Sequence, residues 1–153
     1  MNLPKRTDGE DENPDIPILN PGKTTVFGTP IDTNIASALA YLPLGPLALV
    51  AGYVLLNSPS ESPSFNRYHA MQGLVFTGAM LAVFVVNNVL AAFLGVIPLL
   101  GPLLAIPLGL LGGLLALVYM IVGVKLAFDT YNGKSHKLPY LSKYVNVLLD
   151  KTK

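Results

Sequence analysis

The longest stretch without a charged side chain is the feature that most constrains this fold. Between Arg67 and Lys125 lie 57 consecutive residues without Asp, Glu, Lys or Arg. One membrane-spanning helix needs about 20 predominantly apolar residues, so this block is long enough for at least two spans. A soluble domain carries about 25% charged residues, whereas this chain carries 12%. The sequence therefore predicts an integral membrane protein rather than a free-standing soluble enzyme.

Composition excludes two further classes of protein. The chain has no Cys, so it is not a secreted domain held together by disulfides. Its formal net charge of +1 offers no surface for nucleic-acid phosphates. The expected partners are therefore the lipid bilayer and other integral membrane proteins, not nucleic acid.

The distribution of charge divides the chain into three predicted regions. Residues 1–33 are an extended, Pro-rich tail with three basic and six acidic side chains, a net charge of −3. Residues 34–130 are predicted to form an all-α transmembrane domain. Residues 131–153 are a basic tail, in which the spacing of apolar residues over 138–150 predicts a short amphipathic helix at the membrane interface. The three predicted transmembrane helices cover residues 35–56, 66–94 and 103–128.

Helix breakers interrupt the first predicted span. Pro43 and Pro46 lie inside residues 35–56, and an interior proline removes a backbone donor and clashes with the carbonyl four residues earlier. We therefore expect a kink or a short unwound section there. Because freed carbonyls in lipid need partners from neighbouring helices or water, this section is expected to face protein.

Small residues line one face of the third predicted span. Gly109, Gly113, Ala116 and Gly123 recur at helical spacing, and the first two form a GxxxG pair. Small residues allow two membrane helices to approach closely, and Gly73 lies on a comparable face of the second span. This face is expected to pack on the second span or on a partner helix, and a homo-oligomer is one such arrangement.

Basic residues predict the orientation in the membrane. With three spans, the C-terminal residues and the loop at 57–66 lie on one side, and the tail and the turn at 95–102 lie on the other. Arg67 and four lysines near the spans are on the first side, against essentially Lys23 on the second. The positive-inside rule then places the C-terminus in the cytoplasm and the N-terminus outside. If Asn87-Asn88 marks a turn, there are four spans and both termini are cytoplasmic.

A polar motif marks the start of the second span. His69 and Gln72 are three residues apart on one helix face, and Arg67 lies just before them. A polar side chain in hydrocarbon is costly unless it is hydrogen-bonded, so both are expected to bond to the kinked first span. The cluster is predicted to pin two spans together. The alternatives are a proton, ion or substrate site with a titrating His69, and a docking site for a partner.

Few residues suit catalysis or metal binding. No carboxylate lies within a predicted span, although a proton-driven transporter normally needs an intramembrane acid or a partnered histidine. The two histidines are far apart in sequence, and no nucleophile, base and orienting group fall into a pattern. We therefore expect a non-enzymatic protein without its own catalytic, cofactor or metal site, which could still hold lipid or contact a partner's cofactor. Lys125 is expected to pair with Asp129 at i+4.

Four short motifs stand out within the apolar and basic regions. They are Arg67-Tyr-His-Ala-Met-Gln72, Val96-Ile-Pro-Leu-Leu-Gly101, Tyr131-Asn-Gly-Lys134 and Leu138-Pro139. Over about residues 34–145 the chain resembles a family of small bacterial membrane proteins of unknown function. That family is distantly similar to the twenty-kilodalton, channel-type subunit of the chloroplast inner-envelope protein translocon. The resemblance implies a polytopic helical protein that works within complexes, in a bacterial cytoplasmic membrane or its photosynthetic derivative.

Two functions are compatible with these patterns. The first is a non-enzymatic accessory subunit of a larger membrane complex, bound through its small-residue helix faces and its N-terminal tail. The second is a protein-conducting or small-solute channel formed by oligomerisation, with His69, Gln72 and the kinked first span along the path.

Overall fold

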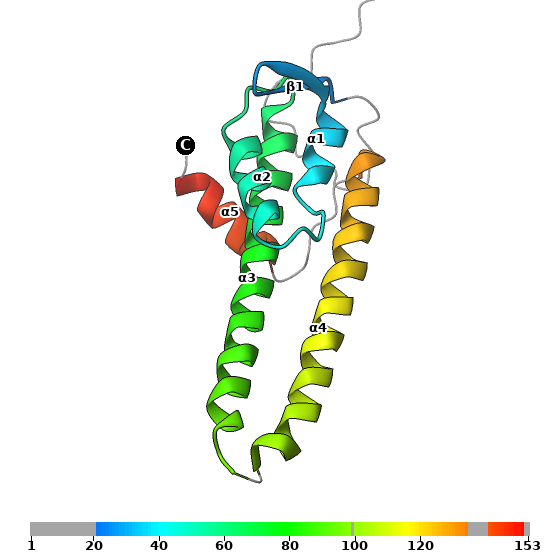
Figure 1. Cartoon of the computed structure of the whole chain (residues 1–153). Helices are drawn as coiled ribbons and strands as arrows, with labels where there is room; N and C mark the ends of the chain where they lie inside the picture. Colours follow the sequence, from blue (N-terminus) through cyan, green and yellow to red (C-terminus); the bar gives the residue numbers. More distant parts are fainter. Residues whose placement is uncertain (1–20, 99, 135–140, 152–153) are drawn as a thin grey trace, which may run out of the picture.

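A long helical hairpin with smaller elements gathered at one end makes up the structure (Figure 1). The computed structural model describes residues 21–98, 100–134 and 141–151. Helices α3 (Pro63–Gly95) and α4 (Leu100–Tyr131) form the hairpin. The other elements lie at the end away from the α3–α4 connection. They are β1 (Lys23–Val26), β2 (Thr29–Asp32), α1 (Thr33–Leu39), α2 (Pro46–Leu56) and α5 (Leu141–Lys151).

The two long helices have the dimensions and composition of membrane spans. They contain 33 and 32 residues, or about 50 Å each at 1.5 Å per residue, against a hydrocarbon core of about 30 Å. Only 11% and 6% of their most apolar stretches are buried, unlike the core helices of a soluble protein. Both are long and apolar enough to cross a membrane. They contain the second and third predicted spans, and α3 runs unbroken through Asn87 and Asn88, so the four-span alternative is wrong.

The first predicted span, residues 35–56, is not a single helix. Its residues form α1 and α2, of 7 and 11 residues, which at about 10 and 16 Å are too short to cross a bilayer. Between them the chain reverses through Leu42-Pro-Leu-Gly-Pro46, where Gly45 has a positive φ of 60° and Pro46 begins α2. The helix break therefore produces a complete turn rather than a kink, and the prediction of three spans is not confirmed.

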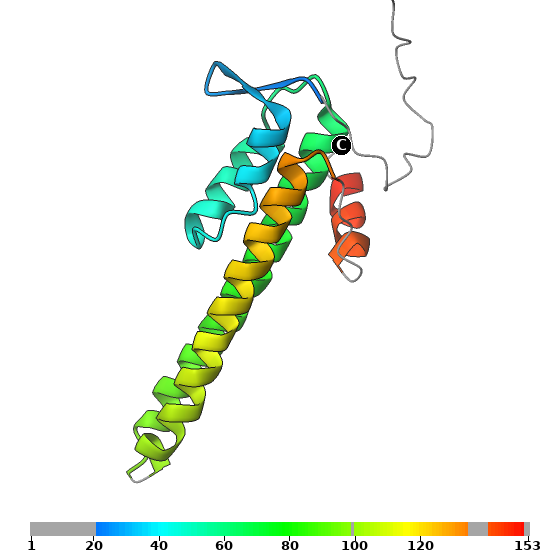
Figure 2. The same ribbon diagram turned by 90° about the vertical axis from the view of Figure 1, so that its right-hand side faces the viewer.

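This reversal places β1 and α5 at the same end of the α3–α4 hairpin (Figure 2). The sequence predicted that the tail and the C-terminal residues lie on opposite sides of a membrane, which requires residues 35–56 to cross it. Because α1 and α2 return to the end from which they started, the described parts of both regions lie at the same end of the α3–α4 hairpin. Residues 1–20 of the predicted tail lie outside the described residues.

Residues 23–32, predicted to be extended tail, form an antiparallel β-hairpin. Val26 pairs with Thr29 next to the turn, and the two turn residues Phe27 and Gly28 have φ values of 50° and 81°. Positive φ at both central residues is the type I′ geometry of two-residue hairpin turns. In the sequence, this hairpin is indicated by the β-branched residues 24–26, which are followed by Phe27-Gly28.

The C-terminal part follows its predicted pattern. At the end of α4, Gly133 has φ 73°, its N–H donates to the Thr130 carbonyl at 2.9 Å, and the Lys134 N–H donates to the Asp129 carbonyl at 2.9 Å. These two bonds make a Schellman motif that ends α4. Helix α5 covers residues 141–150 of the predicted amphipathic segment and ends one residue beyond it, at Lys151. It packs on α3, on the other side of the hairpin from α1 and α2 (Figure 2).

Glycines allow the short helices to approach the long ones closely. A Cβ placed on Gly73 of α3 would lie 2.5 Å from the carbonyl oxygen of Ala40, just after α1, and one placed on Gly123 of α4 would lie 2.8 Å from that of Tyr41. Each distance is shorter than van der Waals contact. The backbone after α1 therefore packs directly against both long helices. Only glycine leaves enough room for it at these two positions.

This close packing predicts opposite effects for two substitutions on α3. Gly73→Ala should lower the free energy of unfolding by about 1–3 kcal/mol, as overpacked cores do, because the backbone of Ala40 cannot move aside. Gly78→Ala meets nothing within 4 Å and should raise it by up to about 1 kcal/mol through helix propensity. Thermal unfolding in mild detergent compares the two, and equal effects of both substitutions would contradict the close approach.

Candidate functional site

A buried cluster of polar side chains lies where three segments meet at the lid end of the hairpin, which we define as the end carrying α1 and α2. His69 and Gln72 come from α3, Tyr41 from the residues after α1, and Thr130 from the last turn of α4. Each of the four is at most 2% exposed. The cluster therefore joins the two long helices to the folded-back pair.

The Tyr41 hydroxyl is the centre of this cluster. It donates to Gln72 Oε1 at 2.9 Å and lies 2.8 Å from His69 Nδ1, with Thr130 Oγ1 at 3.4 Å from the same nitrogen. A hydroxyl has only one proton to donate, so in this arrangement Nδ1 of His69 carries a hydrogen and donates to the tyrosine oxygen. The predicted hydrogen bonding of His69 and Gln72 to the first apolar segment is confirmed, through a residue that the sequence did not single out.

Burial also fixes the protonation state of the tyrosine. Loss of hydration raises the pKa of the Tyr41 hydroxyl well above its usual range, and the neighbouring Tyr68 raises it further. The hydroxyl therefore stays protonated at neutral pH and remains a donor to Gln72. Since the charged form of a buried phenol has lost its hydration, Tyr41 has the properties of a structural hydrogen-bonding group.

Aromatic rings surround the His69 imidazole. The ring centroids of Phe65, Tyr68 and Tyr41 lie 4.4, 5.6 and 5.8 Å from that of His69, two of them nearly perpendicular to it. Tilted and edge-to-face packing of this kind is favourable between aromatic groups. The imidazole is only 1% exposed, so this packing favours a role in holding the helices together over an open ligand site.

Asn66 extends the polar contacts toward α1 and α2. Its Nδ2 donates to the carbonyl of Leu55 at 2.7 Å, and its Oδ1 accepts from Ser37 Oγ at 3.3 Å. The Leu55 carbonyl belongs to the last turn of α2, where carbonyls have no partner within the helix. The sequence could have indicated Asn66 as a further polar contact, because it lies three residues before His69 on the same helix face.

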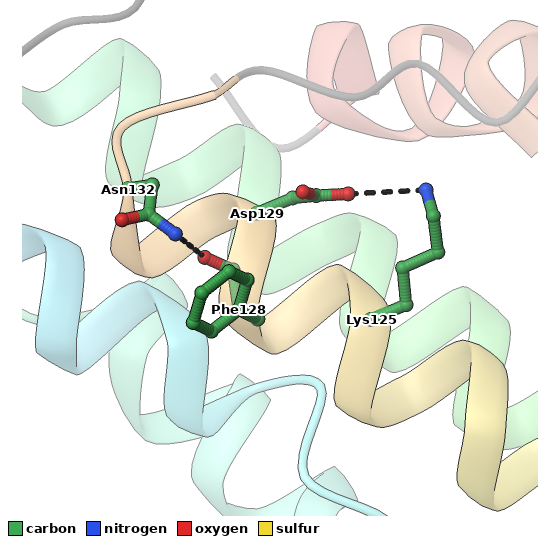
Figure 3. A network of polar contacts seen from close by, with 4 residues as sticks. All are labelled: Lys125, Phe128, Asp129 and Asn132. Carbon is green, nitrogen blue, oxygen red and sulfur yellow. Dashed lines mark hydrogen bonds and ion pairs between the residues drawn. The ribbon is translucent and has the colours of Figure 1, made fainter.

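The charged residues near the cluster lie on the two long helices. Lys125 Nζ is 3.1 Å from Asp129 Oδ2, which confirms the predicted i,i+4 ion pair (Figure 3). The lysine side chain is 65% exposed, so its ammonium group is directed outward from the hairpin. In the next turn Asn132 Nδ2 donates to the Phe128 carbonyl at 2.8 Å (Figure 3). Arg67 is half-buried on α3, two residues before His69.

The small residues predicted to form a packing face divide into two groups. Gly123 is buried against the backbone of Tyr41, whereas a Cβ on Gly109 or Gly113 would have no neighbour within 4 Å and Ala116 is exposed. Two other glycines of α4 approach α3: a Cβ on Gly112 would lie 3.1 Å from Asn87 Nδ2, and one on Gly101 would lie 2.5 Å from the carbonyl oxygen of Gly95. The expectation that Gly109 and Gly113 pack on the second span is therefore wrong, and packing on a partner helix stays a prediction.

Neither a metal site in the described residues nor a known relative indicates the function of this protein. Within residues 21–98, 100–134 and 141–151, no three His, Asp or Glu side chains come close enough to hold a metal ion. Comparisons with known protein families, with characterised proteins and with solved structures gave no match.

The cluster predicts that Tyr41→Phe destabilises the fold. The substitution keeps the ring but removes the hydroxyl, and the buried groups of His69 and Gln72 then lose a shared partner, at a cost of about 1–3 kcal/mol. Tyr53→Phe is the matched control, because Tyr53 is 63% exposed and its hydroxyl is outside the cluster. Thermal unfolding in detergent should show a lower Tm for Tyr41→Phe only. Equal Tm values for the two variants would contradict the central role of the Tyr41 hydroxyl in the cluster.

Proposed function

We propose that this protein is a non-enzymatic accessory subunit that crosses a membrane as the α3–α4 hairpin and binds other integral membrane proteins through α4. The observation that carries the proposal is the exposure of Gly109, Gly113 and Ala116 on a long apolar helix. These residues continue, toward the α3–α4 connection, the face of α4 that Tyr41 covers at Gly123. One part of this face is thus occupied by the protein's own chain, and the other part is open.

The exposed glycines are unfavourable unless a partner covers them. In a helix interior each glycine costs about 1 kcal/mol relative to alanine, and at Gly109 and Gly113 an added methyl group would meet nothing. Contacts within the described chain therefore give no reason for glycine at these two positions. Small residues on membrane helices are the usual means of close helix–helix approach, which supports a partner helix as the occupant.

Charge supports an orientation with the lid end in the cytoplasm. The exposed Lys23, Lys125 and Lys134 belong to that end, and Arg67 lies there half-buried, while residues 68–124 include the α3–α4 connection and contain no charge. By the positive-inside rule the lid end is cytoplasmic. With two spans, both β1 and α5 are then on the cytoplasmic side, and the resemblance noted above favours a bacterial membrane or its photosynthetic derivative.

The contacts of the polar cluster favour this function over a channel. A channel was expected to use His69 and Gln72 along its path, but both side chains are almost fully buried and bonded to Tyr41. Pro43 packs beside Gly123, and Pro46 begins α2, so the break does not unwind within a span. The contribution expected from residues 1–20 lies outside the described residues.

Enlarging the open glycines should remove the partner without unfolding the protein. We expect Gly109→Leu/Gly113→Leu to lose proteins that co-purify in mild detergent, because leucine side chains keep a partner helix from close contact. Leu110→Ala/Leu114→Ala is the control, since these leucines are 71% and 58% exposed on another face of α4. Co-purification followed by mass spectrometry, with thermal unfolding of each variant, gives the comparison. Unchanged partners in the glycine variant would contradict the proposal.

A further inference from the structure

An aromatic side chain occupies the tip of the β-hairpin in an unfavourable backbone conformation. Phe27 is 88% exposed and has a φ of 50°, in the left-handed region that bulky residues rarely adopt. Type I′ turns favour Asn, Asp or Gly at this position because these residues tolerate positive φ. Phe27 thus fits its turn poorly and buries almost none of its ring, so contacts within residues 21–98, 100–134 and 141–151 give no reason for a phenylalanine at this position.

The hairpin is held firmly at its base, which fixes the position of its tip. Thr24 Oγ1 lies 2.9 Å from both Thr33 Oγ1 and Ser60 Oγ, and the Thr25 N–H donates to the Pro59 carbonyl at 2.8 Å. These bonds tie the hairpin to the start of α1 and to the loop before α3. The hairpin consequently lies across the lid end, with its tip on the same side of α3 and α4 as α1 and α2 (Figure 2).

The surface of α1 and α2 beside this tip is apolar. Helices α1 and α2 direct large apolar side chains away from α3 and α4, each between 40% and 66% exposed: Ile35, Leu39, Leu47, Val50 and Tyr53. If α3 and α4 cross a membrane, this surface is in contact with lipid, because α1 and α2 lie against the membrane helices. The tip of the hairpin then lies at the level where these short helices leave the apolar layer.

We propose that Phe27 inserts into the interfacial layer of the lipid bilayer beside α1 and α2. This inference rests on the membrane insertion proposed above and adds a second contact that sets the depth of the lid end. Phe is among the apolar side chains that interfacial segments bury at the boundary between headgroups and acyl chains, and the apolar surface that continues from α1 and α2 favours lipid over water beneath the ring. A tip fixed to the start of α1 holds the short helices at a constant depth.

A single introduced tryptophan tests this contact, because the chain contains none. The full-length Phe27→Trp variant is reconstituted into phosphatidylcholine vesicles whose acyl chains carry bromine either near the headgroup or near the chain end. Bromine near the headgroup should quench the indole at position 27 roughly twofold more strongly than bromine near the chain end, since an interfacial ring lies at that depth. Leu114→Trp, in the middle of α4, is the control and should show the opposite order.

The outcomes separate this inference from membrane insertion. If the Leu114→Trp variant is quenched and the Phe27→Trp variant is not, Phe27 faces water or a protein partner and the inference is overturned, while membrane insertion stands. If neither variant is quenched, both fail. A spin label on Phe27→Cys, in a chain without other cysteines, gives an independent depth measurement should the tryptophan variant fold poorly. Greater accessibility of the label to a polar relaxation agent than to oxygen would also overturn the inference.

Discussion

The hydrogen bonds of one tyrosine hydroxyl hold the architecture together. Tyr41 contacts His69 and Gln72 on α3, and its backbone lies against Gly123 on α4. An imidazole and an amide on a membrane helix are costly without partners. Because Tyr41 lies between α1 and the reversal that leads to α2, its bonds fix the folded-back α1–α2 pair to the polar residues of α3.

This constraint determines how the rest of the chain is arranged. Once α1 and α2 return to the lid end, α3 and α4 are the only helices within the described residues that have the length to cross a bilayer, and the two ends of the described chain lie together. The folded-back pair covers the face of α4 at Gly123 and stops before Gly113 and Gly109. The open part of that face, and the exposed tip of the β-hairpin, are the places where the proposed contacts with a partner helix and with lipid would form.

Sequence patterns predicted the parts of this structure that depend on local properties. The charge-free block predicted both long helices, and the spacing of His69 and Gln72 predicted the buried cluster. The reversal at residues 42–45 was missed because 22 apolar residues fit one span or two short helices equally well, and contacts distant in sequence decide between them. Helical periodicity likewise identified a small-residue face on α4 but not which glycines, Gly101 and Gly112 rather than Gly109, meet α3.

Cysteine accessibility tests most directly whether the chain crosses the membrane twice and returns. In a chain without native cysteines, single cysteines replace the exposed Thr29, Val96 and Lys134, and intact cells are treated with an impermeant thiol reagent. A two-span hairpin with a cytoplasmic lid end predicts labelling at residue 96 only, with residues 29 and 134 labelled after permeabilisation. Labelling of residue 29 but not of residue 134 in intact cells would contradict it, because residues 33–56 would then have to cross the membrane.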